Sequence, residues 1–466
     1  MARNTQVPAD HNAPPITRIL GEFVSTHPGF LAGGWSAEVD HEAHRTFLNW
    51  LGCAVGAAQH EAVDAALAAV KMLQPAAQAS VLGRRDKVDM GSAALVNGIA
   101  SHTFDFDDTH LKTIIHPAGP VASAILALAE HLGSSGREMI DALVLGIDVS
   151  CRVGNAMYPD HYDRGWHITG STGTLGAAAG CARLLKLNTE KTVMALGIAA
   201  SQPVGMREQF GTMTKPMHPG AAARAGLMSA LLASQGYTAS AKAIEAPRGM
   251  MQTVSLKNDW NEITHELGQR FEISFNSYKP FACGIVIHPS IDACAQLRTR
   301  FAQENVTLDQ IERLELKVHS LVLELTGNKE PADGLQAKFS VYHGCAAGLT
   351  FGHAAEDEFS DAIVNRLDMV ALRRKVIATV DDSIDEASAD VTAVLTDGRR
   401  LHVFVEHAIG SLQNPMSDSQ LEAKFQSMSD SILGAGQTSE LINACWAVGQ
   451  AASVAALAQL AAPELL

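Results

Sequence analysis

The spacing of the apolar residues changes near residue 268, and this change most limits the folds open to the chain. Over residues 16–267 apolar residues recur with a helical period, as in "HEAVDAALAAVKML" and "AAARAGLMSALLASQG". After residue 268, four segments alternate apolar with polar residues, as half-buried strands do. They are "IERLELKVHS", "KVIATVDDS", "ADVTAVLTDG" and "RRLHVFVEH". "DGRR" predicts a hairpin turn between the last two. A helical part and a sheet-containing part are therefore expected.

The helical pattern returns after about residue 417. With 466 residues, the chain is too long for one ordinary core. We therefore predict a mainly α fold: a large all-α domain formed by residues 1–267 and 409–466, with a smaller α+β domain inserted at residues 268–408.

Composition excludes several classes of function. A formal net charge of −15 argues against a nucleic-acid partner. The N-terminal "MARNTQVPADHNAPP" has no apolar core of a signal peptide, and the uncharged residues 441–463 are Ala-rich with polar interruptions, which predicts a buried helix rather than a membrane span. Seven scattered cysteines without a CxxC pair indicate reduced thiols. A soluble, cytoplasmic protein is expected, whose Ala- and Gly-rich helices pack closely.

The stretch "SHTFDFDDTH" concentrates carboxylates between His102 and His110. It formally matches a phosphatase D-x-D-x-T motif, but the preceding residues look helical or loop-like, whereas that chemistry needs a buried strand. A magnesium site would need a phosphate partner or further acidic ligands, and neither occurs at a useful spacing. A solvated turn or helix cap is the simplest alternative, although Phe104 and Phe106 suggest that one flank is buried.

Three His-Pro pairs, at His116, His218 and His288, each stand directly before a helical run. Proline is favoured in the first helical turn, so ordinary helix entry explains any one of them. The positive potential of a helix N-terminus also attracts carboxylates and keeps a nearby imidazole neutral, as a general base requires.

A further polar group, "DHYDRGWHITGSTGT", contains His161, Tyr162 and His167, each of which could simply be a buried, hydrogen-bonded side chain. Lys215 and Lys279 both precede proline, which predicts an extended backbone at each. Lys215 lies among apolar residues, where a lysine is costly to bury unless it is paired or used. An ordinary surface lysine is the competing interpretation.

The chain contains no dinucleotide-binding glycine fingerprint, Walker loop or zinc-spaced Cys/His set. Cationic and neutral-base groups without a cofactor suit a protein that holds a carboxylate-bearing small molecule and moves a proton on carbon. A pyridoxal-phosphate enzyme with Lys215 as the Schiff base, and a non-catalytic binding protein, are the alternatives.

The chain resembles the MmgE/PrpD family, which includes 2-methylcitrate dehydratases, cis-aconitate decarboxylases and iminodisuccinate epimerases. The similarity runs in order through "LVNGIASHTFDFDDTH", "HPAGPVASAILALAE", "GWHITGSTGTLGAAAGCARLLKL", "FGTMTKPMHPGAAARAG", "SYKPFACGIVIHPSIDA" and "KFSVYHGCAAGL". The resemblance implies a helical domain with an α+β lid, a homodimer, and no metal or organic cofactor.

The resemblance also implies the site residues. Catalytic roles fall to Lys215, His116 and His167. Substrate-binding roles fall to Asp105, Thr109 and Lys279 on this resemblance, and we further expect His110, His343 and Tyr162 to bind substrate. On this interpretation the acidic cluster is a pocket wall rather than a metal cage.

One departure bears on the reaction. The decarboxylases and dehydratases tend to carry Tyr three residues after the Ser of "FS", whereas here Ser340 is followed at that distance by His343, with Tyr342 one place earlier. The loop from Asp105 to His116 also looks one residue longer than the same loop in the decarboxylases. We therefore expect epimerisation of an iminodisuccinate-type dicarboxylate, with Lys215 and either His116 or His167 on opposite faces of the α-carbon. The alternatives are a 2-methylcitrate dehydratase-like hydro-lyase and a cis-aconitate decarboxylase-like lyase.

Overall fold

The computed structural model describes residues 13–464. Most of the N-terminal segment that we expected to lack a signal peptide lies outside the described residues. The chain divides into two compact units: residues 104–106 and 277–417 form the second, and the remaining residues form the first. The predicted mainly α fold with a small sheet-containing insertion is confirmed.

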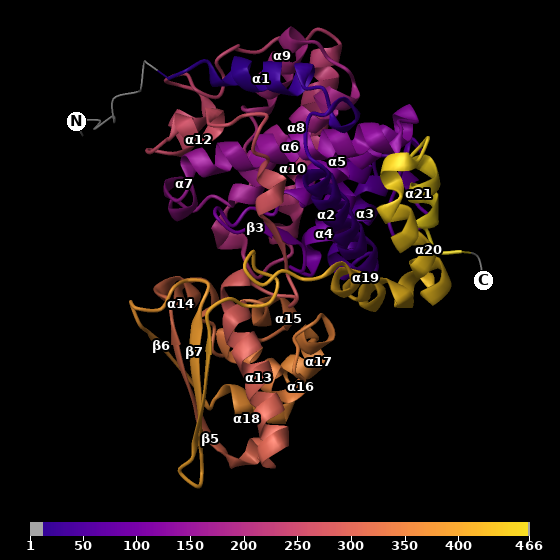
Figure 1. Cartoon of the computed structure of the whole chain (residues 1–466). Helices are drawn as coiled ribbons and strands as arrows, with labels where there is room; N and C mark the ends of the chain where they lie inside the picture. The colour runs from indigo at the N-terminus through magenta and orange to yellow at the C-terminus, as the bar shows by residue number, and fades with distance from the viewer. Residues whose placement is uncertain (1–12, 465–466) are drawn as a thin grey trace. The chain divides into compact units, whose positions relative to one another are not determined.

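The first unit is helical (Figure 1). Its helices are α1 (Ile16–Thr26), α2 (Ala37–Gly56), α3 (Glu61–Lys71), α4 (Met90–Thr103), α5 (Ala118–Leu132), α6 (Gly136–Met157), α7 (Asp160–Asp163), α8 (Ile168–Leu184), α9 (Thr189–Ala199), α10 (Thr214–Ser234), α11 (Met250–Val254), α12 (Trp260–Thr264), α19 (Asp418–Leu433), α20 (Ala435–Trp446) and α21 (Ala455–Leu460). Its short strands are β1 (Ala79–Ser80), β2 (Lys87–Val88) and β3 (Asp108–His110), and β4 (Asn276–Tyr278) spans the boundary between the units.

Small residues let the central helices of this unit approach closely. A Cβ on Gly98 of α4 would lie 2.5 Å from the Cα of Gly220 in α10, and one on Gly146 of α6 would lie 2.8 Å from the carbonyl oxygen of Gly176 in α8. Only glycine fits at such crossings without displacing backbone. The predicted close packing of Ala- and Gly-rich helices is thereby confirmed.

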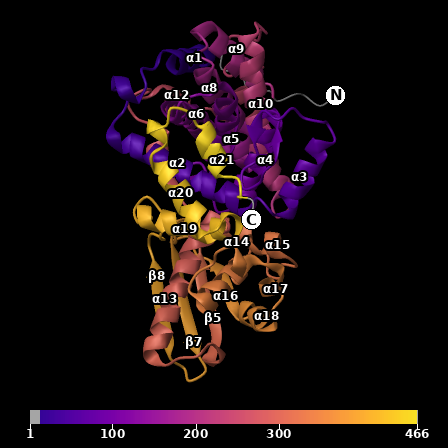
Figure 2. The ribbon, with the colours of Figure 1, turned by 90° about the vertical axis from the view of Figure 1, so that its right-hand side faces the viewer.

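The second unit contains a four-stranded sheet in the order β6-β5-β7-β8. β5 pairs with β6 in parallel and with β7 antiparallel, and β7 pairs antiparallel with β8. The elements are α13 (His288–Glu304), β5 (Ile311–Val318), α14 (Ser320–Thr326), α15 (Gly334–Ala337), α16 (Val341–Phe351), α17 (Asp361–Val364), α18 (Leu367–Arg373), β6 (Val376–Val380), β7 (Ala389–Leu395) and β8 (Arg400–Val405). Figure 2 shows α13 beside the sheet, where it packs on β7 and β8.

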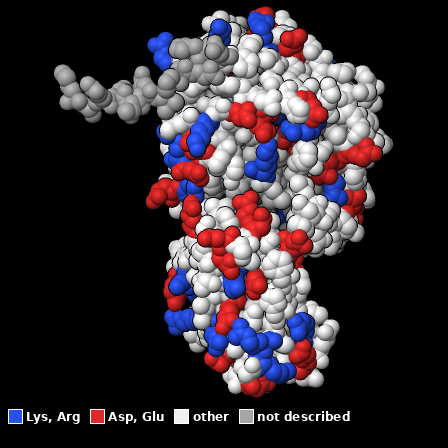
Figure 3. Space-filling model, turned by 60° about the vertical axis from the view of Figure 1, so that its left-hand side comes forward, with Lys and Arg blue, Asp and Glu red and all other residues white. Residues whose placement is uncertain are grey.

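The strands follow the predicted alternation. In β8 the buried side chains are Leu401, Val403 and Val405, while the residues between them are exposed. This pattern buries one face of the strand against α13 and leaves the other to solvent. On the face drawn in Figure 3, Lys and Arg side chains lie among Asp and Glu side chains. The second unit contains ion pairs such as Arg400–Glu315 at 2.5 Å.

The unit boundaries lie later than the predicted ones. The second unit begins at Ser277 rather than at residue 268 and ends at Ser417 rather than at residue 408. Residues before Ser277 are tied to the helical unit, because the Glu272 backbone N–H donates to Asp148 Oδ1 (2.8 Å) and its carboxylate accepts from His110 and Asn155. Residues 272–275 form a 3₁₀ helix that leads directly into β4.

The uncharged C-terminal stretch also differs from the prediction. It forms the end of α20 and the separate α21 rather than one helix, with a 3₁₀ turn at Val448–Gln450 between them. None of the helices in residues 13–464 combines the length and hydropathy needed to cross a bilayer. All seven cysteines are buried and free of disulfides.

Candidate active site

His116 lies at the end of the turn that follows β3, directly before α5. Its backbone N–H donates to Thr169 Oγ1 (3.0 Å), and its ring Nδ1 donates to the carbonyl oxygen of Asp108 (2.7 Å). Thr109 Oγ1 lies 3.3 Å from the same ring nitrogen. A carbonyl can only accept, so Nδ1 carries the proton. The neutral His116 ring can therefore accept a further proton only at Nε2.

Asp107 lies between two imidazoles. Its Oδ2 accepts from Nδ1 of His102 on α4 at 2.6 Å, and its Oδ1 lies 3.4 Å from Nδ1 of His116. All three side chains are buried. One carboxylate thus orients two rings.

Asp108 faces away from this pair. Its Oδ2 accepts from the Ala118 backbone N–H (3.1 Å) and from Asn276 Nδ2 (2.8 Å). Burial, followed by the charge of Asp107, raises the pKa of Asp108 to about 7. The consecutive carboxylates differ in role, because Asp108 bonds the start of α5 while Asp107 bonds His102.

His167 and His218 form a second imidazole pair. The Nδ1 atoms of the two rings lie 2.9 Å apart, so one ring donates and the other accepts. His167 is the residue directly before α8, and His218 belongs to the first turns of α10. The rings of His102 and His167 are stacked with centroids 5.6 Å apart, and those of His102 and His116 are 4.9 Å apart. Four histidines thus lie in one continuous cluster.

Lys215 is buried on α10 and adds a cation beside this cluster. Its Nζ lies 5.5 Å from the centre of the Phe210 ring, and that ring packs edge-on against His167 at 5.1 Å. The predicted extended backbone at Lys215 is wrong, because the residue is helical and Pro216 falls within the first turn of α10. Proline costs no hydrogen bond in that turn.

The histidines beside Lys215 are held neutral. Burial first, and then the positive charge of His102, Lys215 and other neighbours, places the pKa of His167 well below its usual value. The same causes lower the pKa of His218 to about 4. Neutral imidazoles next to a buried ammonium group can exchange protons with a bound acid at neutral pH.

His-Pro pairs do not all mark helix entry. Pro117 directly precedes α5, and His288 begins α13 with proline in its first turn. His218 and Pro219 instead lie inside α10. The expectation that His218 stands directly before a helix is therefore wrong, and its ring is delivered to the site from within the helix.

Asp105 and Lys279 pair within the second unit. Lys279 Nζ donates to Asp105 Oδ1 (2.8 Å) and to its carbonyl oxygen (3.1 Å). Lys338, which the sequence patterns did not single out, donates to the Phe104 carbonyl oxygen (2.7 Å), to that of Ala282 (2.9 Å) and to Glu356. Two buried lysines thus hold residues 104–106, and Asp105 adopts a left-handed conformation there (φ 51°).

Three other predicted residues have contacts within their own units. His110 uses both ring nitrogens, towards Thr113 Oγ1 (2.8 Å) and Glu272 Oε2 (2.9 Å). Tyr162 is buried, and the Cζ atom of Arg207 lies over its ring, 4.1 Å from the ring centre. His343 is fully buried, with Nε2 2.9 Å from the Glu358 carbonyl oxygen. Their substrate-binding roles stay predictions.

The cluster also contains the atoms of a possible metal site. One ligand-type atom each from His102, Asp107 and His116 lie within 4.8 Å of one another. The hydrogen bonds from His102 to Asp107 and from His116 to the Asp108 carbonyl already use the Nδ1 atoms. These contacts account for the arrangement without a cation, and metal independence stays a prediction.

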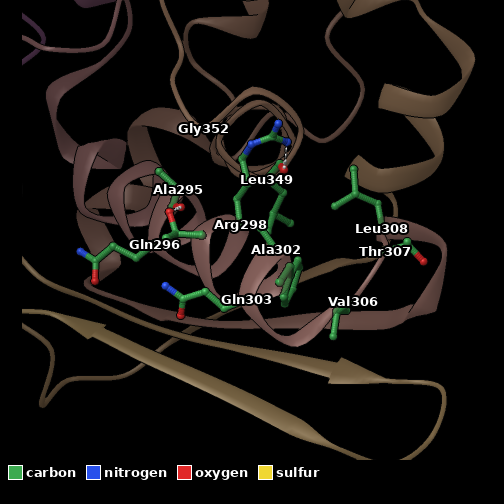
Figure 4. A pocket seen from close by; sticks show the side chains of 12 residues that line it. Ala295, Gln296, Arg298, Ala302, Gln303, Val306, Thr307, Leu308, Leu349 and Gly352 are labelled. Atoms are coloured by element: carbon green, nitrogen blue, oxygen red, sulfur yellow. Dashed lines mark hydrogen bonds between the residues drawn. The ribbon is translucent and has the colours of Figure 1, made fainter.

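A groove elsewhere lacks acid–base groups. It has a volume of about 910 Å³ and lies along α13 and the end of α16, with mostly apolar side chains (Figure 4). Its arginine, Arg298, donates to the carbonyl oxygens of Leu349 and Thr350 and so caps α16. Nothing in its lining matches the chemistry of the histidine cluster.

The sequence patterns alone did not assign His102, Asp107 and His218 to the site. All three stand in the motifs described above, but the pairing of their side chains depends on how α4 and α10 cross. The cluster is carried by α4, the turn before α5, the start of α8 and the first turns of α10. Fold and cluster together define a class: a mainly helical protein with an inserted α+β unit and a buried cluster of histidine, lysine and carboxylate side chains in its helical unit.

The chain belongs to the MmgE/PrpD family. Residues 22–263 match the MmgE/PrpD N-terminal domain and residues 281–448 the C-terminal domain. It is 26% identical to the cis-aconitate decarboxylase-like protein oryM of Aspergillus oryzae (92% of this chain, 94% of the relative). It is 25% identical to a cis-aconitate decarboxylase of Aspergillus terreus (87% and 88%) and 27% identical to that of Homo sapiens (92% and 91%). The expected family is confirmed, and these relatives bear a lyase name.

Proposed function

We propose that the protein is a lyase that acts on a small polycarboxylate by forming negative charge on a carbon next to a carboxylate. Decarboxylation of cis-aconitate is the reaction to test first, because relatives that align over most of both chains are named for it. This proposal favours the lyase alternative over the epimerase that the altered Tyr/His position had suggested.

The observation that carries the proposal is the pairing of neutral imidazoles with a buried lysine. His116 can act at Nε2 because its Nδ1 is committed to the Asp108 carbonyl oxygen. His167 can act at Nε2 because its Nδ1 is committed to His218. Lys215 supplies positive charge beside them, where low solvent access strengthens its interaction with an anion.

In the proposed reaction, the bond between carbon and one carboxyl group breaks and CO₂ leaves. The electron pair stays on carbon and spreads into the neighbouring unsaturated carboxylate, and one proton is then added to carbon. A preorganised ammonium group lowers the energy of that anion. An imidazole first takes up a proton from solvent at Nε2, then delivers it to carbon and returns to its neutral form, so each turnover consumes one proton.

Epimerisation of an iminodisuccinate-type dicarboxylate is the second candidate. It requires a proton carrier on each face of the α-carbon, and the cluster contains more than one such group in His116, His167 and Lys215. The His343 substitution that suggested this reaction lies in the second unit, where its ring contacts the Glu358 carbonyl oxygen. This candidate therefore rests on the histidine cluster and not on residue 343.

The experiment is incubation of the purified protein with cis-aconitate in heavy water, followed by NMR and CO₂ measurement. Decarboxylation predicts CO₂ and a deuterated alkene product. Incubation with 2-methylcitrate and with single stereoisomers of iminodisuccinate in parallel tests dehydration and epimerisation, the latter seen as α-deuterium exchange without a new alkene. Exchange or dehydration without CO₂ would overturn the decarboxylase assignment.

Variants make this experiment specific. Lys215→Met should abolish the reaction, while Lys242→Met, which changes an exposed lysine of the same unit, should leave it unchanged. A visible absorption spectrum separates the proposal from the pyridoxal-phosphate alternative, since that cofactor absorbs above roughly 320 nm in its Schiff-base forms. Failure of all three substrate classes would overturn the proposed function.

A further inference from the structure

The four clustered histidines are not equivalent. His116 and His102 direct Nδ1 towards oxygen acceptors, the Asp108 carbonyl and Asp107. His167 and His218 instead direct Nδ1 towards each other. An oxygen acceptor fixes the proton on the histidine, whereas two imidazole nitrogens can each hold it.

The His167–His218 contact is sealed from solvent. The two residues are 2% and 3% exposed, and neither ring forms a second hydrogen bond within residues 13–464. Gly205 lies beside both residues in a left-handed conformation (φ 101°), and its carbonyl oxygen accepts from the His167 backbone N–H (3.0 Å). A Cβ there would lie 3.0 Å from His218 Nδ1 and 3.1 Å from the His167 Cβ, so a larger residue would push the pair apart.

The charged and titratable neighbours of the pair come from every element around it. They are Lys215 on α10, His102 on α4 and His116 before α5, and each carries positive charge when protonated. These neighbours oppose a full positive charge on His167. A second imidazole to which charge can pass reduces that cost.

We propose that His218 is the proton-exchange partner of His167, so that the acid–base group of the site is an imidazole pair sharing one proton. This inference rests on the proposed function. When His167 Nε2 takes a proton from substrate or solvent, the Nδ1 proton of His167 moves to His218 Nδ1. The N–H bond on His167 breaks as the new N–H bond on His218 forms, and the positive charge ends on His218. Delivery of a proton to substrate carbon reverses these steps.

His218 is thus a positioning residue that acts through His167. Its role differs from that of a merely structural hydrogen bond, which an amide could also provide. Asn at position 218 can orient the His167 ring but cannot pass a proton on. His218→Asn therefore separates orientation from proton exchange, and His161→Asn is the matched control. His161 is equally buried in the same unit, but it bonds Ser171 Oγ (2.7 Å) and the Val254 carbonyl oxygen (3.1 Å).

The kinetic test uses cis-aconitate, with dicarboxylate exchange in heavy water as the second assay. His218→Asn should lower kcat roughly 100-fold with KM changed less than about threefold, as expected when proton transfer rather than binding is lost. The pH profile of kcat should lose one limb in His218→Asn and keep both in His161→Asn. An unchanged kcat in His218→Asn would overturn the inference.

A spectroscopic test does not depend on activity. With ¹⁵N-histidine-labelled wild-type protein, a shared proton predicts ¹⁵N–¹⁵N coupling between the Nδ1 atoms of residues 167 and 218, lost in His218→Asn and retained in His161→Asn. Absence of the coupling in folded wild-type protein overturns the pair. Coupling together with failure of every substrate supports the pair and rejects only the proposed function.

Discussion

Buried histidines and lysines occur in both units, but His343 of the second unit and His167 of the first differ in their contacts. In the second unit, His343 contacts the Glu358 carbonyl oxygen through Nε2 and lies 3.5 Å from Arg373 through Nδ1. In the first unit, His167 bonds only through Nδ1 within the described residues. A ring with both nitrogens engaged holds the fold, while a ring with one nitrogen available can exchange protons.

Two buried lysines also differ in their surroundings. Lys338 donates to two backbone carbonyl oxygens and to Glu356, which completes the capacity of an ammonium group. Lys215 lies over the Phe210 ring in a cluster of imidazoles. Burial of a cation therefore does not by itself identify a catalytic group.

The largest expected effect is on turnover. Lys215→Met should reduce kcat for cis-aconitate roughly 1000-fold, because one preorganised charge contributes about 4 kcal/mol to a developing anion. Its thermal midpoint should change little, since removal of a buried cation also removes a desolvation cost. Kinetics and calorimetry on the same preparation check both parts. Normal turnover would break the contrast with Lys338.

The reverse pattern is expected for Lys338→Met. This change leaves two buried carbonyl oxygens and Glu356 without their donor and should lower the free energy of unfolding by about 3 kcal/mol. Urea unfolding measures it. A stable Lys338→Met protein with greatly reduced turnover would show that this lysine, too, belongs to the chemistry.

The helix crossing beneath the site gives a smaller effect. Gly98→Ala should cost about 2 kcal/mol, because its Cβ would meet the backbone of Gly220 at 2.5 Å. It should also lower kcat, since α4 carries His102 and α10 carries His218. Gly436→Ala, whose Cβ would meet nothing within 4 Å, is the control and should stay within about 1 kcal/mol of wild type. Equal stability of the two variants would show that the crossing adjusts at no cost.

The smallest effect concerns acid stability. Burial lowers the pKa of His343 to about 4 from an ordinary 6.5. Below that ordinary value the unfolded chain binds a proton that the folded chain does not, so stability is retained above pH 6.5 and falls as pH drops, by about 1.4 kcal/mol per pH unit. His343→Gln should therefore lose less stability than wild type between pH 6.5 and about 5, measured by urea unfolding. The exposed His131→Gln should behave as wild type.

Local pattern predicted most elements. Period and turn residues placed the helices of the first unit and β5 to β8, because both signals depend on neighbours in the chain. They failed at Lys215, where the following proline predicted an extended backbone, and at His218, where the helix was expected to begin just after the His-Pro pair. At these two positions the packing of α10 on its neighbouring helices outweighs the local backbone preference beside proline.

The sequence by itself determined the family, the two kinds of unit and the supply of histidine, lysine and carboxylate groups. Only the tertiary structure decided which of them are partners. His167 and His218 are 51 residues apart, and Asp105 and Lys279 are 174 apart. Contacts between residues so far apart in the chain depend on how closely glycine lets the helices cross. They also depend on which backbone carbonyl oxygens each imidazole ring or ammonium group meets. The local spacing of residues encodes neither.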